Sequence, residues 1–453
     1  MTAQTLLILG ASGDLTARLL LPGLGRLVDA GGVGDLTLLG SGTDDWDDGT
    51  WRDRVRESFG TVGEAAGAVA DSARYLTADV TRADDLKRLL DARDGELVIF
   101  FALPPAVTAK ACTALREIGL PAGTRLVLEK PFGVDEASAR SLNELLGELV
   151  PEGQIHRVDH FLGKSTVLNI LGLRFANRIF EPVLNNEHVE SVDIVFDEDL
   201  GLESRAGYYD GAGALVDMIQ SHLLQILALI AMDAPPSLDA HEFRDRKAQV
   251  LRATHLWGDD PSTATRRARY TAGQIGDRRL PSYADEPGVD AARGTETLAE
   301  LVLAVDTWRW AGVPFRLRSG KALGSRRKEA VITFKPAPFV PVGLSGPDRP
   351  DRLRVLFSPD RIELDIDING PGDPFVLDPV TLGSDFGSGE LPPYGEVLRG
   401  VLDDDPTLSV RGDTAEVCWR IVEPALAAWR AGDVPLLEYP AGSTGPEDSL
   451  LPG

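Results

Sequence analysis

A series of short apolar runs, each ending at a turn and followed by a helical pattern, constrains the fold more than any other feature. The first run, Thr5–Leu9, ends at Gly10, and Asp14–Ala30 is predicted to be a helix. Buried strands that alternate with helices form a parallel sheet with crossover helices. We therefore expect an α/β domain over residues 1–155. Comparable apolar runs lie at Leu36–Leu39, Glu96–Ala102 and Arg125–Leu128.

The first strand–helix junction carries a glycine-rich hexapeptide, GASGDL, at residues 10–15. Glycines there allow a tight turn and let a pyrophosphate approach the backbone, while the amino end of the helix supplies N–H groups. The position indicates a dinucleotide site in a Rossmann domain, although the motif alone leaves a plain turn open. The candidate cofactor residues in this segment are Gly10, Ser12, Gly13, Asp14 and Leu15.

The end of the second strand selects between nicotinamide cofactors. An acidic residue there binds the 2′-hydroxyl of the adenine ribose, whereas an arginine accepts the 2′-phosphate of NADP. The sequence GSGTDD at residues 40–45 offers Asp44 and Asp45, and the nearest arginine is Arg52. The two aspartates either contact the ribose or cap the next helix. Further candidate cofactor residues are Gly40, Thr43 and, after the run that ends at Ala102, Pro104.

The pattern changes after about residue 155 of the 453. Leu168–Phe180 is predicted to be helical, and Asp217–Ala231 is a long apolar helix. Strand-like segments with half-exposed faces follow a helix-rich part, a combination that favours an α+β domain over residues 156–453. The predicted strands are Val189–Phe196, Ala330–Lys335, Leu353–Phe357 and Arg361–Ile368.

The formal net charge of −24 argues against a nucleic-acid partner. It also means that an anionic substrate needs a local basic pocket. The segment from Arg309 to Lys328 is a basic concentration that forms either that pocket or a solvated face. The two cysteines, Cys112 and Cys418, have neither metal-ligand spacing nor a disulfide framework, which favours the cytoplasm and no metal. We expect no membrane-spanning run.

Two motifs contain candidate catalytic groups, RVDHFLGK at residues 157–164 and DMIQSH at 217–222. Oxidation of a hydroxyl by hydride transfer needs a base for the hydroxyl proton. A histidine suits this task, and a carboxylate partner fixes its tautomer. From spacing alone, however, a core histidine at 222 and an ordinary charged loop at 159–164 are the simpler interpretations.

Ten segments, in order along the chain, resemble the glucose-6-phosphate dehydrogenase family. The resemblance implies a Rossmann domain plus a larger domain with a broad, mainly antiparallel sheet on which subunits dimerise. It implies oxidation of glucose 6-phosphate at carbon 1 to 6-phosphogluconolactone with NADP or NAD, the first step of the oxidative pentose phosphate pathway. The segments are GASGDL, FALPP, EKPFG, RVDHFLGK, RFANRIFEP, RAGYYD, DMIQSHLLQ, KAQVLRA, TET and RWAGVPFRLRSGK.

The resemblance also implies residue roles. His222 resembles the general base and Asp159 its orienting carboxylate. Lys130 resembles a bridge between sugar and cofactor, and the peptide before Pro131 is expected to be cis. The other implied substrate ligands are His160 and Lys164 for the phosphate, Glu198, Asp217 and Lys321 for the sugar hydroxyls, and Arg326 as a further basic contact.

The chain departs from the family pattern at several positions. Its missing arginine near Thr43 predicts use of NAD as well as, or instead of, NADP. Phe161 replaces a tyrosine and Val216 an arginine, which keeps open a diverged dehydrogenase of another sugar or sugar phosphate. The other departures are Ser165 for glutamate, Ser221 for asparagine and Thr444 for tryptophan.

An alternative from another class is a catalytically inactive cofactor-binding relative. The joint presence of Asp159, His222, Lys130 and Lys321 argues against it, because an inactive protein has no chemical need for all four. The resemblance further implies a homodimer or homotetramer.

Overall fold

Two structural units make up the chain, and each gathers segments that lie far apart in the sequence. The computed structural model describes residues 3–203, 206–347, 349–385, 387, 389–446 and 450. The first unit comprises Met1–Ser165, Pro235–Asp245 and Ser388–Val417; the second comprises Thr166–Ala234, Arg246–Gly387 and Cys418–Gly453. Nothing in the sequence pattern indicated that the two later segments belong to the first unit.

A six-stranded, fully parallel sheet forms the centre of the first unit, as the Rossmann prediction requires. The strand order is β3-β2-β1-β4-β5-β6, so the winding direction reverses between β1 and β4. Ligands of such sheets bind at the carboxyl ends of the strands beside this reversal. The strands are β1 (Gln4–Leu9), β2 (Leu36–Gly42), β3 (Arg74–Thr77), β4 (Glu96–Phe101), β5 (Arg125–Glu129) and β6 (Ile155–Val158).

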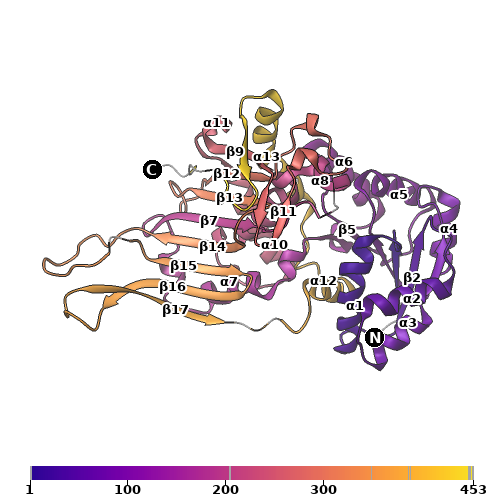
Figure 1. The fold of residues 1–453 in the computed structure, drawn as a ribbon. Coiled ribbons are helices and arrows are strands. Elements are labelled where there is room, and N and C mark those ends of the chain that lie inside the picture. Colours follow the sequence, from indigo (N-terminus) through magenta and orange to yellow (C-terminus); the bar gives the residue numbers. More distant parts are fainter. Residues whose placement is uncertain are drawn as a thin grey trace. The chain divides into compact units, whose positions relative to one another are not determined.

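Helices lie on both faces of this sheet (Figure 1). The predicted first helix is confirmed as a π-helical turn, Thr16–Leu20, that continues into α1. The helices are α1 (Leu21–Asp29), α2 (Asp48–Phe59), α3 (Glu64–Ser72), α4 (Ala83–Asp91), α5 (Pro105–Ile118), α6 (Glu136–Leu149) and α12 (Pro393–Leu402).

Helix α12 lies close to the carboxyl end of the sequence but contributes to the core of the first unit, where it packs on α1 (Figure 1). A Cβ at Gly23 would lie 2.9 Å from the Gly395 nitrogen, so the small residue permits close approach. The Arg125 side chain, 2% exposed, donates from Nη1 to the carbonyl oxygens of Val401 and Leu402 at 2.9 and 2.7 Å. Its Nη2 pairs with Glu96 at 2.7 Å. One buried guanidinium thus fixes the end of α12 to β5.

The second unit is built on a ten-stranded, mainly antiparallel sheet, which confirms the predicted fold class. Among the strand pairs of the described residues, β7–β13 and β9–β18 are parallel and the others in this sheet are antiparallel. The order is β17-β16-β15-β14-β7-β13-β12-β9-β18, with β8 beside β12. The strands are β7 (Val189–Asp197), β8 (Thr254–Leu256), β9 (Thr265–Thr271), β12 (Leu298–Val305), β13 (Phe315–Gly320), β14 (Arg327–Phe334), β15 (Arg352–Phe357), β16 (Asp360–Asn369), β17 (Leu377–Asp385) and β18 (Leu436–Pro440).

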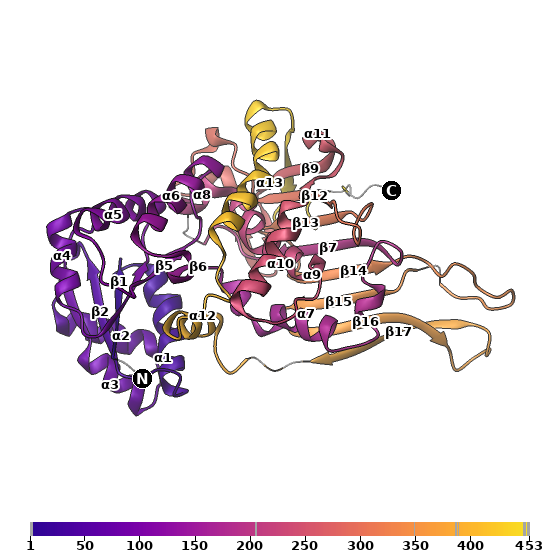
Figure 2. The same ribbon diagram turned by 180° about the vertical axis from the view of Figure 1, so that it is seen from behind.

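One face of the large sheet is covered by the apolar helix 206–231, which consists of α8 (Ala206–Ala214), a π-helical segment (Leu215–Leu223) and α9 (Leu224–Ala231) (Figure 2). By length and composition this helix could cross a membrane, so the expectation that no run reaches that length is wrong. However, 83% of its most apolar window is buried inside the protein. Its apolar surface therefore belongs to the core of the second unit.

Helix α7 (Ser165–Phe175) ends before the predicted Phe180. The Asn177 amide donates to the carbonyl oxygens of Gly172 and Leu173 at 3.0 and 3.2 Å. These bonds satisfy carbonyls of the last turn from outside the helix and so favour its termination there. The remaining regular elements are α10 (Ala240–Arg252), α11 (Pro261–Ala264), α13 (Gly412–Ala431) and the hairpin of β10 (Gly273–Ile275) and β11 (Arg278–Leu280).

Replacement of Arg125 by methionine tests the anchoring of α12. The substitution removes the guanidinium donor from two buried carbonyl oxygens, although that of Leu402 also accepts from the Gln4 side-chain amide at 3.0 Å. The loss costs about 1–3 kcal/mol and should lower the melting temperature by roughly 2–10 °C. Arg116→Met is the matched control, because Arg116 only pairs with Glu148 at the surface, at 2.9 Å. Equal melting temperatures for the two variants would contradict the anchoring role.

Candidate functional site

The turn after β1 is a tight glycine turn that fits a dinucleotide. Gly10 has φ +87°, and a Cβ there would collide with the carbonyl oxygen of Ala102 at the end of β4. The amides of Gly10 and Ala11 both donate to the Ser41 oxygen, at 2.8 and 2.9 Å. The turn therefore brings bare backbone to the start of a helix, where a pyrophosphate can receive N–H groups. These residues fit the nicotinamide cofactor that the sequence predicts.

The other predicted cofactor residues lie along the same edge of the sheet. A Cβ at Gly40 would lie 2.7 Å from the nearest atom of the Trp51 ring, so a side chain there would collide with the ring. Thr43 follows β2 and is exposed. Pro104 is the N-cap of α5, in the short connection between β4 and that helix. Asp14 pairs with Arg18 at 3.2 Å on the surface, and Leu15 packs against the core of the first unit. The carboxyl ends of β1, β2 and β4 thus bring the set together.

The alternative that Asp44 caps α2 is wrong. Asp47 is the cap: its carboxylate accepts from the Thr50 amide at 2.8 Å. The Asp44 carboxylate instead accepts a hydrogen bond from the Ser12 hydroxyl in the glycine turn. The acidic side chain at the end of β2 is therefore available at the cofactor edge.

The motif after β6 (157–164) places its polar groups around a 3-10 turn, His160–Gly163. The buried Asp159 accepts from the Phe161 amide at 2.9 Å. His160 stacks on Tyr394 of α12, with ring centroids 5.5 Å apart. The Lys164 ammonium lies 4.5 Å from the Phe161 ring centroid. Phe161, in place of a tyrosine, thus offers this lysine a cation–π contact rather than a hydroxyl.

Glu129, at the end of β5, is a part of this region that the sequence analysis missed. Burial raises its pKa to about 7, although a hydrogen bond with Tyr394 and the charge of Lys130 act in the opposite direction. The Lys130–Pro131 peptide is cis, as expected. Tyr394 comes from a segment more than two hundred residues away, so no local pattern could have pointed to it.

Two of the predicted sugar ligands in the second unit, Glu198 and Lys321, form an ion cluster with Lys328. Glu198 accepts from Lys321 at 2.8 Å and from Lys328 at 3.2 Å. Burial disfavours the ionised Glu198 carboxyl, but the two ammonium groups outweigh this and lower its pKa. The Lys321 ammonium also lies 5.0 Å from the Tyr209 ring centroid. Arg326 lies apart from this cluster, exposed and paired with Asp199 at 2.6 Å.

His222 and Asp217 share the π-helical segment of the long apolar helix. His222 is 1% exposed. Burial and then the Asp217 carboxylate raise the pKa of the neighbouring Tyr209 well above its usual value. Such π-helical segments are rare and recur at functional sites.

Glu296, from the TET motif, holds the start of this segment. Its carboxylate accepts from the Leu215 amide at 3.0 Å, and its backbone oxygen accepts from Ala214 at 3.2 Å. Gly213 has φ +67°, and a Cβ there would collide with the Glu296 carboxylate. Burial raises the pKa of Glu296 to about 7. A buried acid thus positions the helix that carries His222 and Asp217.

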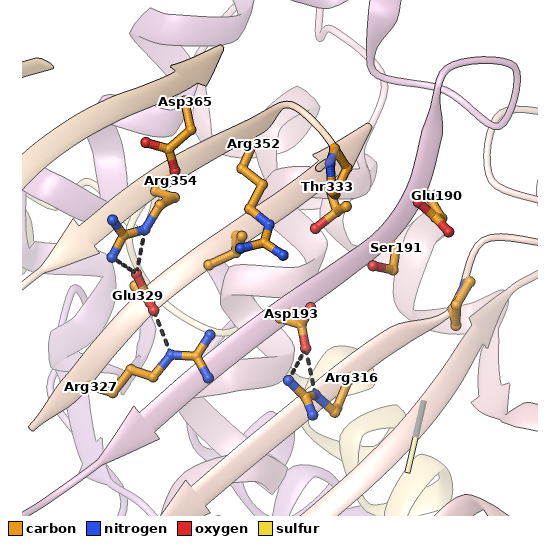
Figure 3. Close-up of a pocket in the computed structure, with 13 residues that line it drawn as sticks. Glu190, Ser191, Asp193, Arg316, Arg327, Glu329, Thr333, Arg352, Arg354 and Asp365 are labelled. Atoms are coloured by element: carbon orange, nitrogen blue, oxygen red, sulfur yellow. Dashed lines mark hydrogen bonds and ion pairs between the residues drawn. The ribbon is translucent and has the colours of Figure 1, made fainter. Parts of the chain in front are cut away.

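The basic segment 309–328 does not form a single pocket. Along β14, alternate residues point to opposite faces of the sheet. Lys328 joins Glu198, whereas Arg327 lines a cavity of about 550 Å³ on the other face, together with Arg316, which pairs with Asp193 (Figure 3). None of the described residues that line this cavity is a predicted ligand. No group of three or more His, Cys, Asp or Glu among the described residues is placed to hold a metal ion.

Comparisons with known proteins cover the whole length. The family model "Glucose-6-phosphate dehydrogenase, NAD binding domain" matches residues 7–169, and the model of the same enzyme's C-terminal domain matches 171–450. The glucose-6-phosphate 1-dehydrogenase of Gluconobacter oxydans is 39% identical, over 98% of this chain and 94% of its own length. That of Mycolicibacterium smegmatis is 37% identical, over 98% and 94%.

Two solved structures agree with this similarity. A glucose-6-phosphate dehydrogenase in complex with its substrate glucose 6-phosphate has a TM-score of 0.88 and 28% identity, covering 98% of this chain and 95% of its own. The glucose-6-phosphate 1-dehydrogenase of Mycobacterium avium has a TM-score of 0.85 and 32% identity, with the same coverage.

Glu296→Gln tests the buried carboxyl. The raised pKa means that its contribution to stability is complete below about pH 4.5 and is lost as the pH rises through about 7. Glutamine keeps an acceptor for Leu215 but carries no charge. The melting temperature of the variant relative to the wild type should therefore rise between pH 5 and pH 8, by the equivalent of about 3 kcal/mol at most.

The control for this measurement is Glu57→Gln at an exposed position. A difference between Glu296→Gln and the wild type that stays constant across the same pH range would show that the carboxyl does not titrate there.

Proposed function

The chain belongs to the glucose-6-phosphate dehydrogenase family, and from this membership we propose that it oxidises glucose 6-phosphate at carbon 1 to 6-phosphogluconolactone. The observation that carries the proposal is the full-length similarity to dehydrogenases named for this reaction. In the oxidative pentose phosphate pathway this is the first step.

His222 is proposed as the general base that takes the proton from the carbon-1 hydroxyl, with Asp159 as the carboxylate that orients it. The bound nicotinamide supplies the hydride acceptor. The support in the second unit is that His222 is buried on a helix whose start is fixed by Glu296. The support in the first unit is that the Phe161 amide fixes the Asp159 carboxylate. A base with a defined position lowers the entropic part of the barrier.

The ligands of the sugar phosphate are proposed from the family resemblance. His160 and Lys164 serve the phosphate, because charge-assisted hydrogen bonds are the strong ones. In this proposal the stacking of His160 on Tyr394 fixes its ring. The ligands of the sugar hydroxyls are Glu198, Asp217 and Lys321, with Lys130 between sugar and cofactor. For Arg326 the support is weakest, since Asp199 engages its guanidinium.

The cofactor is proposed to lie along the edge formed by Gly10, Ser12, Gly13, Gly40 and Thr43, with Pro104 at the start of α5. We further propose a cytoplasmic homodimer or homotetramer, as the family resemblance implies. The net charge of −24 supports the absence of nucleic-acid partners.

His222→Asn tests the base. Loss of a positioned general base should reduce kcat by about 10²- to 10⁴-fold with little change in KM, measured by the absorbance of the reduced nicotinamide. His188→Asn, at an exposed histidine of the same unit, is the control. Retention of the wild-type kcat in His222→Asn would contradict the assignment of His222 as the general base.

Lys164→Gln tests phosphate recognition and separates the proposed substrate from a free sugar. Loss of a charge-assisted bond should raise the KM for glucose 6-phosphate by about 10- to 100-fold, while any turnover of glucose stays unchanged. Lys87→Gln, which only breaks a surface pair with Asp91, is the control. A higher kcat/KM for glucose than for glucose 6-phosphate in the wild type would favour the diverged dehydrogenase, for which Phe161 is the motivating feature.

A further inference from the structure

Asp44 is held in place from two directions at the end of β2. Its backbone oxygen accepts from the Trp46 amide at 2.9 Å, from the Tyr75 hydroxyl at 3.3 Å and from the Thr77 hydroxyl at 3.2 Å. Its carboxylate accepts from the Ser12 hydroxyl, 32 residues away in the glycine turn. Although the residue is exposed, its carboxylate is therefore fixed beside the turn that receives the dinucleotide.

Two acids that follow Asp44 have structural roles in the first unit. Asp47 caps α2 through the amide and hydroxyl of Thr50, at 2.8 and 2.7 Å. Asp48 accepts from the Tyr75 amide at 2.8 Å. The Asp44 carboxylate instead accepts from Ser12, a serine of the cofactor turn. The position of this carboxylate is the one from which an acid contacts the adenine ribose in this fold.

The arginines of the adjacent helices are engaged elsewhere. Arg52 donates to the Ala73 oxygen at 2.9 Å and lies 3.7 Å from Asp48. Arg54 lies 3.7 Å from Glu57, and its guanidinium carbon also lies 6.0 Å from the ring centroid of Trp46. Arg18 pairs with Asp14 at 3.2 Å. A 2′-phosphate at this place would meet a fixed carboxylate, and these three arginines would first have to leave their present partners to neutralise it.

We propose that Asp44, oriented by Ser12, makes the cofactor site selective for NAD over NADP. The carboxylate accepts the 2′-hydroxyl of the adenine ribose and repels a phosphate at the same position. A carboxylate that accepts from a hydroxyl forms one of the stronger hydrogen bonds, and a dianion placed against it is destabilised. The inference rests on the proposed function, because it concerns the cofactor of that dehydrogenase.

Equilibrium binding of NAD⁺ and of NADP⁺, each without sugar phosphate, tests the proposal by calorimetry. The wild type should bind NAD⁺ at least about tenfold more tightly than NADP⁺. Asp44→Asn and Asp44→Ala should each weaken NAD⁺ and tighten NADP⁺, so that the ratio of the two Kd values falls by about tenfold or more. Ser12→Ala should move the ratio in the same direction by a smaller factor.

Asp71→Ala is the control, since Asp71 is an exposed carboxylate of the first unit that pairs with Arg56 at 2.7 Å, and its loss should leave the ratio unchanged. Three results would overturn the proposal: tighter binding of NADP⁺ by the wild type, an equal change for both cofactors in the Asp44 variants, or the same shift of ratio in Asp71→Ala. Melting temperatures of the variants confirm that each is folded.

The outcome also separates this proposal from the proposed reaction. Selective NAD⁺ binding without turnover of glucose 6-phosphate supports the role of Asp44 and rejects the reaction. Binding of neither dinucleotide rejects the cofactor site, and with it both proposals.

Discussion

The close approach of backbone at Gly10 is the constraint on which the cofactor edge depends. A side chain there would collide with Ala102, so the turn can pass between β1 and β4 only as glycine. The same turn allows two consecutive amides to bond to Ser41 on β2. Through these contacts the ends of three strands come together, and Ser12 is placed within reach of Asp44. Gly10, which has no Cβ, therefore permits the turn that is proposed to bind the pyrophosphate. The same turn places Ser12 beside Asp44, the residue that is proposed to determine cofactor selectivity.

In each of the two units a buried carboxyl group forms hydrogen bonds that position candidate site residues of that unit. Glu129 bonds to Tyr394, which stacks on His160, and Glu296 fixes the helix that carries His222. Burial raises the pKa of both acids to about 7. A group that is costly to ionise in the interior is tolerated where its hydrogen bonds position other residues. Each carboxyl thus positions a neighbouring residue through a hydrogen bond.

The basic segment shows why a run of charges along the sequence is a poor guide to a pocket. In a strand, successive side chains point to opposite faces. Lys328 therefore reaches the Glu198 cluster, while Arg327 reaches the cavity on the far face of the sheet. From the sequence these neighbours were expected to form either one pocket or one solvated face, and the pleat of the strand divides them.

The strand–helix alternation, the glycine hexapeptide and the ten motifs were enough to predict the fold class, the family and the cofactor edge, because these features depend on residues close together in sequence. The end of α7 was not predicted, because it depends on the Asn177 side chain. Its amide donates to the carbonyl oxygens of Gly172 and Leu173, and these bonds take the place of those that a longer helix would make. The placement of α12, the Glu129–Tyr394 bond and the choice of Asp47 over Asp44 as helix cap required tertiary structure. Each is decided by burial or by competition among partners far apart along the chain, which no local pattern records.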